Sequence, residues 1–397
     1  MSYYLLPSVK LFNNSKNINI SFSNEEPNSF INKTLNLYLN AIKIQISNYG
    51  DKWDNFKKYT NSYEYIHSCI PNTKLSVCKY KPLSRSFYKM IEINSLLQLE
   101  DELPENCNSF HLAEGPGGFI EAFSHIRNNQ EDKYYGMTLQ DEHPDVPGWK
   151  KSQMFLRNNL NVVIENGADG TGNLMKKENL KYCYTKYGGK MNLITADGGF
   201  DFSVDFNKQE VISLKLIYSQ ICFAIAMQKK NGCFILKIFD IFTRPSIELI
   251  FLLSCFYKKV YICKPHTSRC ANSEKYIVCK QFIYDDVKEI IDIFLKNYDN
   301  LEDKTLNLVK ILNFEIPYFF INKIEEINAI YGQQQVENIS YTISIIENRK
   351  TDKLDSVKKI NINRCIEWCQ KHHLPYNKNA QTTNIFLSQK CNLDNSE

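Results

Sequence analysis

Two charged residues stand within or directly after apolar segments of the sequence. Lys237 lies inside the apolar run 233–238, and Asp197 follows the apolar run 192–196. An ammonium or carboxylate group is costly to bury unless it is paired, so we expect these two side chains to be partners. A lysine held in this way can take or steer a proton if its pKa is lowered toward neutrality. The alternative is a lysine on an edge strand that faces solvent.

A glycine-rich segment lies where a buried strand is expected to end and a helix to begin. In an open α/β sheet, ligands bind at the carboxyl ends of the strands, and a helix N-terminus offers unpaired N–H groups there. The glycine spacing fits neither a dinucleotide loop nor a Walker loop. Glu-x-Pro-Gly-Gly is instead typical of the S-adenosylmethionine loop of methyltransferases, and a tight turn without a ligand is the alternative. The candidate cofactor residues are Glu114, Gly115, Pro116, Gly117, Gly118 and Phe119.

Thirteen of the 15 glycines lie between Gly115 and Gly232, which indicates loops that something must approach. One further cluster is the segment 167–172, and Asp169 within it can accept a hydrogen bond from an adenine amine. A plain Asp-Gly turn is the alternative for this residue. The cluster at 198–199 follows Asp197.

Short apolar runs alternate with helical periodicity in the middle of the chain, as in an α/β fold with a doubly wound, mostly parallel sheet. The last two of seven predicted strands have no helix between them, so we expect them to form an antiparallel hairpin. The predicted strands are 110–113, 134–139, 161–165, 192–196, 233–238, 259–263 and 275–279. The predicted helices are 31–46, 84–97, 118–127, 149–158, 209–227, 246–257, 290–295 and 306–324.

The composition is that of a globular protein, with 43% hydrophobic and 23% charged residues among 397. Collagen-like and disordered classes are thereby excluded. The formal net charge of +4 permits a nucleic-acid partner without arguing for one. The 13 scattered cysteines and the lack of an N-terminal signal predict reduced thiols and a cytoplasmic location. No apolar run approaches the ~20 residues that span a bilayer, so no membrane is expected.

Four potential metal ligands, Cys365, Cys369, His372 and His373, lie close together near the C-terminus. Their spacing is not that of a standard zinc finger or ribbon. The same spacing describes one face of a helix. We therefore expect no metal site.

Four segments, in this order, resemble the FtsJ-like ribose 2′-O-methyltransferases: 84–89, 114–119, 195–199 with Lys237, and 272–278. The resemblance aligns the catalytic Lys-Asp-Lys-Glu tetrad of that family with Lys89, Asp197, Lys237 and Glu274. The stretch 264–274 looks most like the Adrift-type branch, which contains cap-specific mRNA 2′-O-methyltransferases and homologues in large cytoplasmic DNA viruses. The segment 205–216 looks particularly like the viral homologues.

The resemblance implies a Rossmann-like methyltransferase domain over residues 81–285. It leaves an N-terminal helical extension, 1–80, and a mainly helical C-terminal region, 286–397, that we expect to end in a mobile tail. It also implies S-adenosylmethionine as cofactor and Lys237 as general base. Thr138 stands where many family members place the acid that holds the cofactor ribose, and Asp197 lies beside the cofactor loop.

The implied partner is RNA, and capped mRNA in particular. Basic residues near the tetrad are candidate phosphate contacts, with solvated charged faces as the alternative. These residues are Lys81, Arg85, Lys264 and Arg269. Other capping or transcription proteins are further candidate partners, and for a viral protein the location would be the host cytoplasm or the virion.

Two other functions stay open at this point. One is the same methyl transfer on structural RNA such as rRNA. The other is a catalytically silent RNA-binding or scaffold subunit, against which the intact tetrad argues. A dinucleotide-dependent oxidoreductase is disfavoured by the glycine spacing.

Overall fold

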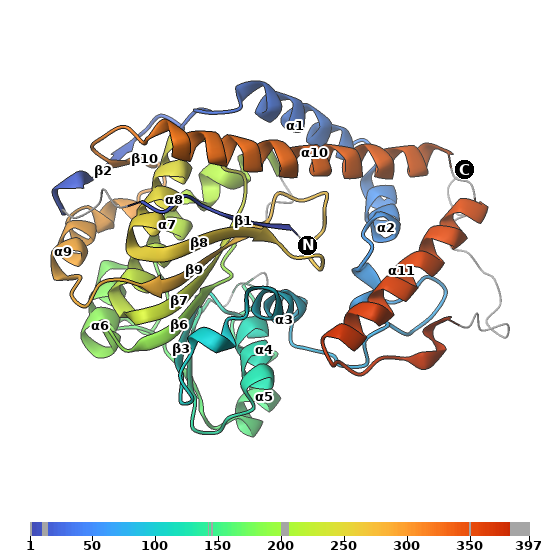
Figure 1. Ribbon diagram of the computed structural model, residues 1–397, viewed down its shortest axis with the longest axis horizontal. Coiled ribbons are helices and arrows are strands. Elements are labelled where there is room, and N and C mark those ends of the chain that lie inside the picture. The colour runs from blue at the N-terminus through green and yellow to red at the C-terminus, as the bar shows by residue number, and fades with distance from the viewer. Residues whose placement is uncertain are drawn as a thin grey trace.

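A mixed eight-stranded sheet forms the centre of the computed structural model (Figure 1). The structure describes residues 2–9, 15–141, 143, 146–199, 206–348 and 351–381. The strand order is β1-β8-β9-β7-β6-β3-β4-β5. The strands are β1 (Ser2–Leu5), β3 (Asn108–Leu112), β4 (Lys133–Met137), β5 (Val162–Ile164), β6 (Met191–Ala196), β7 (Gln228–Ile238), β8 (Tyr257–Lys264) and β9 (Lys275–Phe282).

The seven predicted strands are all present, and the mostly parallel α/β sheet is confirmed. The pairs β3–β4, β4–β5, β3–β6 and β6–β7 are parallel. The predicted hairpin is also confirmed, because β9 pairs antiparallel with β8. In addition, β9 pairs antiparallel with β7, so it inserts between β7 and β8.

The eighth strand corrects the expectation that the N-terminal extension is helical. Strand β1 pairs antiparallel with β8, with Tyr4 opposite Ile262, and Tyr3 packs edge-on against Tyr261 at 5.9 Å. A four-residue strand is too short to show a periodicity in the sequence. Strand β1 is held in place by its hydrogen bonds to β8, and it covers the edge of β8 that would otherwise be unpaired.

Helices cover both faces of the sheet, and residues of β7 alternate between two cores. Phe234 and Leu236 face the core formed with α7 and α8, whereas Cys233 and Ile235 face the core formed with α3 and α4. The helices of this region are α3 (Ser86–Leu97), α4 (Gly118–Arg127), α5 (Gln153–Asn158), α6 (Lys177–Tyr187), α7 (Gln209–Met227), α8 (Arg244–Phe256) and α9 (Lys288–Lys296).

One stretch, Phe206–Met227, which includes α7, is long and apolar enough to cross a membrane by length and composition. However, 78% of its most apolar window is buried inside the molecule. Core helices commonly pass the same test, so this stretch is weak evidence for a membrane span.

The segments outside the predicted methyltransferase domain pack against each other and against the sheet. Helices α1 and α10 lie side by side, and α11 contacts α2 (Figure 1). Strands β2 and β10 form a separate antiparallel pair. The elements are β2 (Ile18–Ser23), α1 (Lys33–Ile46), α2 (Gly50–Thr60), β10 (Asn307–Leu312), α10 (Tyr318–Asn348) and α11 (Thr351–Lys371). Short 3₁₀ turns occur at Ser15–Asn17, Glu64–Ile66, Glu100–Glu102, Phe206–Lys208, Tyr298–Leu301 and Lys378–Gln381.

Two expectations for these outer segments were wrong. The N-terminal extension is not helical throughout, because it contributes β1 and β2. The helix predicted over 306–324 is instead β10 followed by the start of α10, since the apolar residues of 307–312 find a partner strand in β2. Helix α6, which belongs to the sheet region and not to the outer segments, had not been predicted either. The mobile tail was expected over roughly the last twenty residues. Of these, Lys378–Gln381 form a 3₁₀ turn, and 382–397 lie outside the described residues.

Candidate active site

The carboxyl ends of two neighbouring strands bring Asp197 and Lys237 together. Asp197 directly follows β6, and Lys237 lies near the end of β7. The Lys237 Nζ donates a hydrogen bond to the backbone oxygen of Asp197 at 2.6 Å and lies 3.4 Å from its Oδ1. The predicted pairing is therefore confirmed. The alternative of a solvent-facing edge lysine is wrong, because β7 lies between β6 and β9.

A second ion pair, which is buried, joins Lys89 of α3 to Glu274, the residue before β9. The Lys89 Nζ lies 2.7 Å from one carboxylate oxygen of Glu274 and 2.8 Å from the other. Burial lowers the pKa of Lys89, although the charge of Glu274 opposes this shift. Burial alone would raise the pKa of Glu274, but Lys89, Lys237 and Lys264 hold it well below its usual range. Glu274 is therefore ionised at neutral pH.

Tyr276 joins the two pairs into one site. It stands opposite Lys237 in the β7–β9 register, and its hydroxyl donates to the Asp197 Oδ1 at 2.8 Å. The Lys89 ammonium lies 5.8 Å from the centre of its ring. Sequence reasoning did not single out Tyr276. The available signal was its spacing of two from Glu274, which places both side chains on one face of an extended segment.

The predicted cofactor loop is held by its own glutamate. The Glu114 Oε1 accepts hydrogen bonds from the backbone N–H groups of Phe119 and Ile120, at 2.8 and 2.9 Å, and so caps the start of α4. Its Oε2 is buried and has no hydrogen-bond partner among the described residues. Burial raises the pKa of Glu114 to about 8, helped by the charge of Asp197.

The glycines of this loop allow close packing around the site. Gly117 has a φ of +110°, which favours glycine, and precedes α4. A Cβ on Gly118 would collide with the hydroxyls of Ser84 and Ser86, so this glycine lets α4 approach the segment that starts α3. A Cβ on Gly115 would lie 2.7 Å from the backbone oxygen of Gly148. These two glycines are thus required by protein packing, and their contact with a cofactor stays a prediction.

The loop nevertheless fits S-adenosylmethionine by two observations. A buried carboxyl oxygen without a partner is costly, and a hydrogen-bonding group on a ligand would satisfy it. The loop also starts beside Asp197, because Leu112 of β3 pairs with Ala196 of β6 and the two strands end together. Pro116 and Phe119 belong to the same loop, and Phe119 packs parallel to Tyr276 at 5.9 Å. The cofactor loop and the two ion pairs therefore form one continuous site.

The other two predicted cofactor residues lie in separate loops. Thr138 is buried just after β4, and the close approach of Gly172 to its backbone brings the two loops together. Asp169 is exposed, and its Oδ1 accepts hydrogen bonds from the backbone of Thr171 at 2.9 Å and from Asn179 at 2.9 Å. These bonds support the turn interpretation of Asp169, and its adenine contact stays a prediction.

The four predicted phosphate contacts all have partners within the protein. Arg269 donates two hydrogen bonds to Glu64, at 2.6 and 3.0 Å, and Arg85 lies 3.9 Å from the same carboxylate. Lys81 donates to Ser76. Lys264 donates to the loop that carries Glu274. Their role in RNA binding stays a prediction.

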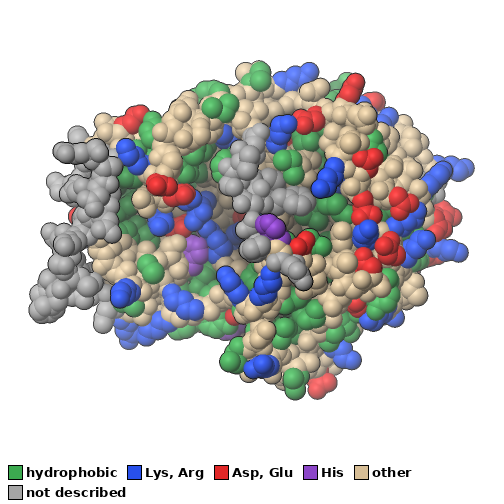
Figure 2. Space-filling model, turned by 180° about the vertical axis from the view of Figure 1, so that it is seen from behind, with side chains coloured by type: hydrophobic (Ala, Val, Ile, Leu, Met, Phe, Trp, Pro, Cys, Tyr) green, Lys and Arg blue, Asp and Glu red, His purple; other side chains and the backbone are tan. Residues whose placement is uncertain are grey.

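Glu64 was missed by sequence reasoning, and its neighbouring sequence carries no motif. Its pKa is lowered to about 2, because the two arginines outweigh the effect of burial. Figure 2 shows a hollowed face on which Lys, Arg and His side chains gather.

The four candidate metal ligands near the C-terminus do not converge. Cys365 and Cys369 are buried on α11, whereas His372 packs on Trp368 at 4.4 Å. Within the described parts of the chain, no three His, Cys, Asp or Glu side chains are grouped as a metal site would require.

A model of the FtsJ-like methyltransferase family matches residues 82–282, just over half of the chain. The cap-specific mRNA (nucleoside-2′-O-)-methyltransferase 2 of Drosophila melanogaster is 26% identical over 331 residues, which cover 78% of this chain and 45% of that protein. The cap-specific mRNA (nucleoside-2′-O-)-methyltransferase 1 of Leishmania braziliensis is 40% identical over 179 residues, which cover 43% of this chain and 42% of that protein. The chain thus spans less than half the length of these curated relatives.

A solved structure of a ribosomal RNA methyltransferase from Plasmodium falciparum shares 21% sequence identity, with a TM-score of 0.37. The match covers 51% of this chain and 98% of that structure. The family match, by contrast, contains all four tetrad residues and the whole glycine loop. The chain belongs to the FtsJ-like methyltransferases, which take their methyl group from S-adenosylmethionine.

Proposed function

We propose that this protein methylates the ribose 2′-hydroxyl of a cap-proximal nucleotide in mRNA. The observation that carries the proposal is the junction of a partly buried ion pair, Lys237–Asp197, with a buried one, Lys89–Glu274, beside the glycine loop. The names of the relatives support the choice of capped mRNA as substrate. The amino-acid sequence of 264–274 supports membership of the Adrift-type branch. From the sequence of 205–216 we also propose a relationship to the homologues in large cytoplasmic DNA viruses.

Lys237 is the residue proposed to act as general base. Bound S-adenosylmethionine supplies an electrophilic methyl group, and the 2′-hydroxyl must lose its proton as the new bond forms. A neutral lysine has two N–H groups and one lone pair. The backbone oxygen of Asp197 accepts one of these N–H groups, which fixes the direction of the amine and leaves the lone pair for the hydroxyl proton. Positioning of this kind supplies a large share of the rate acceleration.

Lys89 and Glu274 have a different role in the proposal. Their mutual contact neutralises two charges that are both largely buried. The pair therefore sets a fixed local field beside Lys237 without requiring either group to titrate near neutral pH. The Tyr276 hydroxyl donates a hydrogen bond to the carboxylate of Asp197 and so fixes its position.

The direct test is Lys237→Ala. We expect its methylation rate on a short capped RNA to fall at least ~100-fold, because the general base is lost. S-adenosylmethionine affinity, measured by calorimetry, should stay within about twofold. Lys229→Ala is a matched control, since Lys229 is an exposed lysine on the same strand. Wild-type methylation by the Lys237→Ala variant would overturn the assignment of the base.

The substrate is tested separately with the wild-type protein. We expect methylation of capped RNA to exceed that of the same RNA without a cap, with the methyl group mapped by mass spectrometry to a cap-proximal ribose. Preferred methylation of structured rRNA fragments would contradict the cap proposal while keeping the reaction. Cofactor binding without methylation of any RNA would favour the silent RNA-binding subunit.

A further inference from the structure

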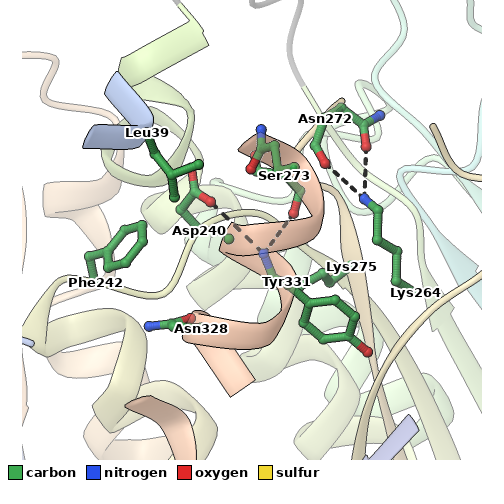
Figure 3. Close-up of a pocket in the computed structure, with 11 residues that line it drawn as sticks. Leu39, Asp240, Phe242, Lys264, Asn272, Ser273, Lys275, Asn328 and Tyr331 are labelled. Carbon is green, nitrogen blue, oxygen red and sulfur yellow. Dashed lines mark hydrogen bonds and ion pairs between the residues drawn. The ribbon is translucent and has the colours of Figure 1, made fainter. Parts of the chain in front are cut away.

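Lys264, at the end of β8, lies opposite the residues that precede β9. Its Nζ donates to the backbone oxygen of Asn272 at 2.8 Å, to the Asn272 Oδ1 at 3.0 Å and to the backbone oxygen of Glu274 at 2.7 Å. Figure 3 shows the two contacts with Asn272. A lysine ammonium has three N–H donors, and here each has one acceptor. The side chain therefore closes the loop 265–274 across its base.

We propose that Lys264 is a positioning residue that sets Glu274 against Lys89. The inference rests on the proposed function, because the loop matters to activity only if the tetrad carries out methyl transfer. Lys264 does not touch the Glu274 carboxylate. It fixes the backbone at Glu274, and the carboxylate then receives Lys89 at 2.7 Å and the Ser268 hydroxyl at 2.8 Å.

The surroundings of Lys264 favour this internal role over a contact with RNA. It borders a cavity of about 10 Å³ between the loop and α10, which has room for no more than a water molecule. Asp240 and Lys275 border the same cavity (Figure 3), and Asp240 also pairs with Lys43 of α1 at 2.8 Å. Helix α10 contacts the loop as well, since Gln335 donates to the backbone oxygen of Ala271 at 2.9 Å.

The charge of Lys264 is sensitive to pH near neutrality. Burial, then the charges of Lys275 and Lys89, lower its pKa to about 7, while Cys270 and Glu274 oppose the shift. Asp240 is the remaining charged group that lines the same cavity, where Tyr331 of α10 is a further titratable group. When the ammonium loses its proton, only two N–H groups remain for three acceptors. One bond across the base of the loop is then lost.

Hydrogen–deuterium exchange of the full chain tests this step without any substrate. We expect protection of the amides in 265–274, corrected for the intrinsic exchange rate, to fall about tenfold between pH 6 and pH 8.5 in the wild-type protein. Lys264→Arg keeps its charge over this range, so its protection should change less than twofold. An equal change with pH in the two proteins, or protection in Lys264→Met equal to that of the wild type at pH 6, would overturn the proposal.

Kinetics supply the second test. We expect Lys264→Met to lower kcat on capped RNA by about 100-fold, with KM for RNA and cofactor affinity within about threefold, because a misplaced tetrad slows only the chemical step. Lys258→Met is the matched control, since Lys258 is exposed near the start of the same strand. An unchanged kcat in Lys264→Met would overturn the proposal.

The two readouts separate the inference from the function on which it rests. If the wild-type protein methylates no RNA, the proposed function fails, and the exchange result still decides whether Lys264 closes the loop. If the wild type is active and the exchange pattern does not depend on Lys264, the inference fails and the proposed function stands.

Discussion

Each carboxylate at the centre of the site is held by groups from distant parts of the chain. Glu274 meets Lys89, 185 residues away in sequence, and Asp197 meets Lys237 and Tyr276. Removing one partner of a buried ion pair leaves an uncompensated charge, whereas replacing both partners with apolar groups can be nearly neutral. The stability of the fold and the chemistry of the site therefore depend on the same side chains.

The Lys89–Glu274 pair gives the first prediction at this scale. Glu274→Ala should lower the free energy of unfolding by about 3 kcal/mol, because the buried Lys89 ammonium loses its counter-ion. The free energy of unfolding should fall clearly less in the double variant Lys89→Met with Glu274→Met, although we expect that variant to be inactive. Urea denaturation at pH 7 measures both. A double variant less stable than Glu274→Ala would contradict this account.

Glu114 gives a prediction about pH. Its pKa is about 8 in the folded chain against 4.5 in an exposed glutamate, so the folded state holds the proton more tightly. The stability from this group is complete below pH 4.5 and is lost as the pH rises toward 8. Without cofactor, the free energy of unfolding of Glu114→Gln should be close to that of the wild type at pH 5. At pH 9 it should be higher by on the order of 1–3 kcal/mol. Equal urea midpoints at pH 9 would count against the buried charge.

At the scale of elements, another buried glutamate, Glu210, connects α7, the segment after β7 and α8 through hydrogen bonds. Glu210, at the start of α7, accepts hydrogen bonds from the backbone of Phe242 at 2.9 Å and of Thr243 at 2.8 Å, and from the Ser246 hydroxyl at 2.6 Å. These donors belong to the segment after β7 and the first turn of α8. One carboxylate thus connects α7 to α8 and to the segment that follows β7, the strand that carries Lys237.

Glu210→Ala should therefore destabilise the fold by about 3 kcal/mol, because several buried donors lose their acceptor together. Thermal unfolding followed by circular dichroism measures the loss. Glu178→Ala, at an exposed position of α6, is the control and should change stability by less than ~0.5 kcal/mol. A Glu210→Ala variant as stable as this control would show that the connection is dispensable.

At the scale of the whole molecule, the segments outside the family match share cores with the sheet. One apolar cluster joins Trp53 of α2 and Ile339 of α10 to Phe242, which follows β7. Strand β1 covers the edge strand β8, and Leu6 belongs to the main core. The N- and C-terminal segments are therefore structural parts of the catalytic unit.

The excised segment 82–282 should consequently fail to fold on its own. It would expose the edge of β8 and the face of the loop 265–274 that α10 covers. We expect no cooperative thermal transition and rapid proteolysis, where the full chain gives one sharp transition. A cooperative transition in the segment within a few degrees of that of the full chain would contradict the shared core.

The sequence by itself determined much of the central sheet and the pairing of Lys237 with Asp197. Seven apolar runs with helices between most of them allow few arrangements, and a lysine in such a run needs a partner. Lys89 and Glu274 came from the resemblance to a family, since neither residue stands in a pattern that demands an ion pair. These features are local in sequence or carried by a motif, so they can be read without coordinates.

Only the tertiary structure decided which distant groups meet. Strand β1 is too short to show periodicity, and β10 was mistaken for a helix because its partner β2 lies some 290 residues earlier in the chain. The contacts of Glu64 with Arg269, and of Lys264 with Glu274, give basic residues internal roles that their charge alone could not indicate. Periodicity in the sequence indicates which face of an element is buried. The residues that this face contacts depend on what the rest of the fold places opposite it.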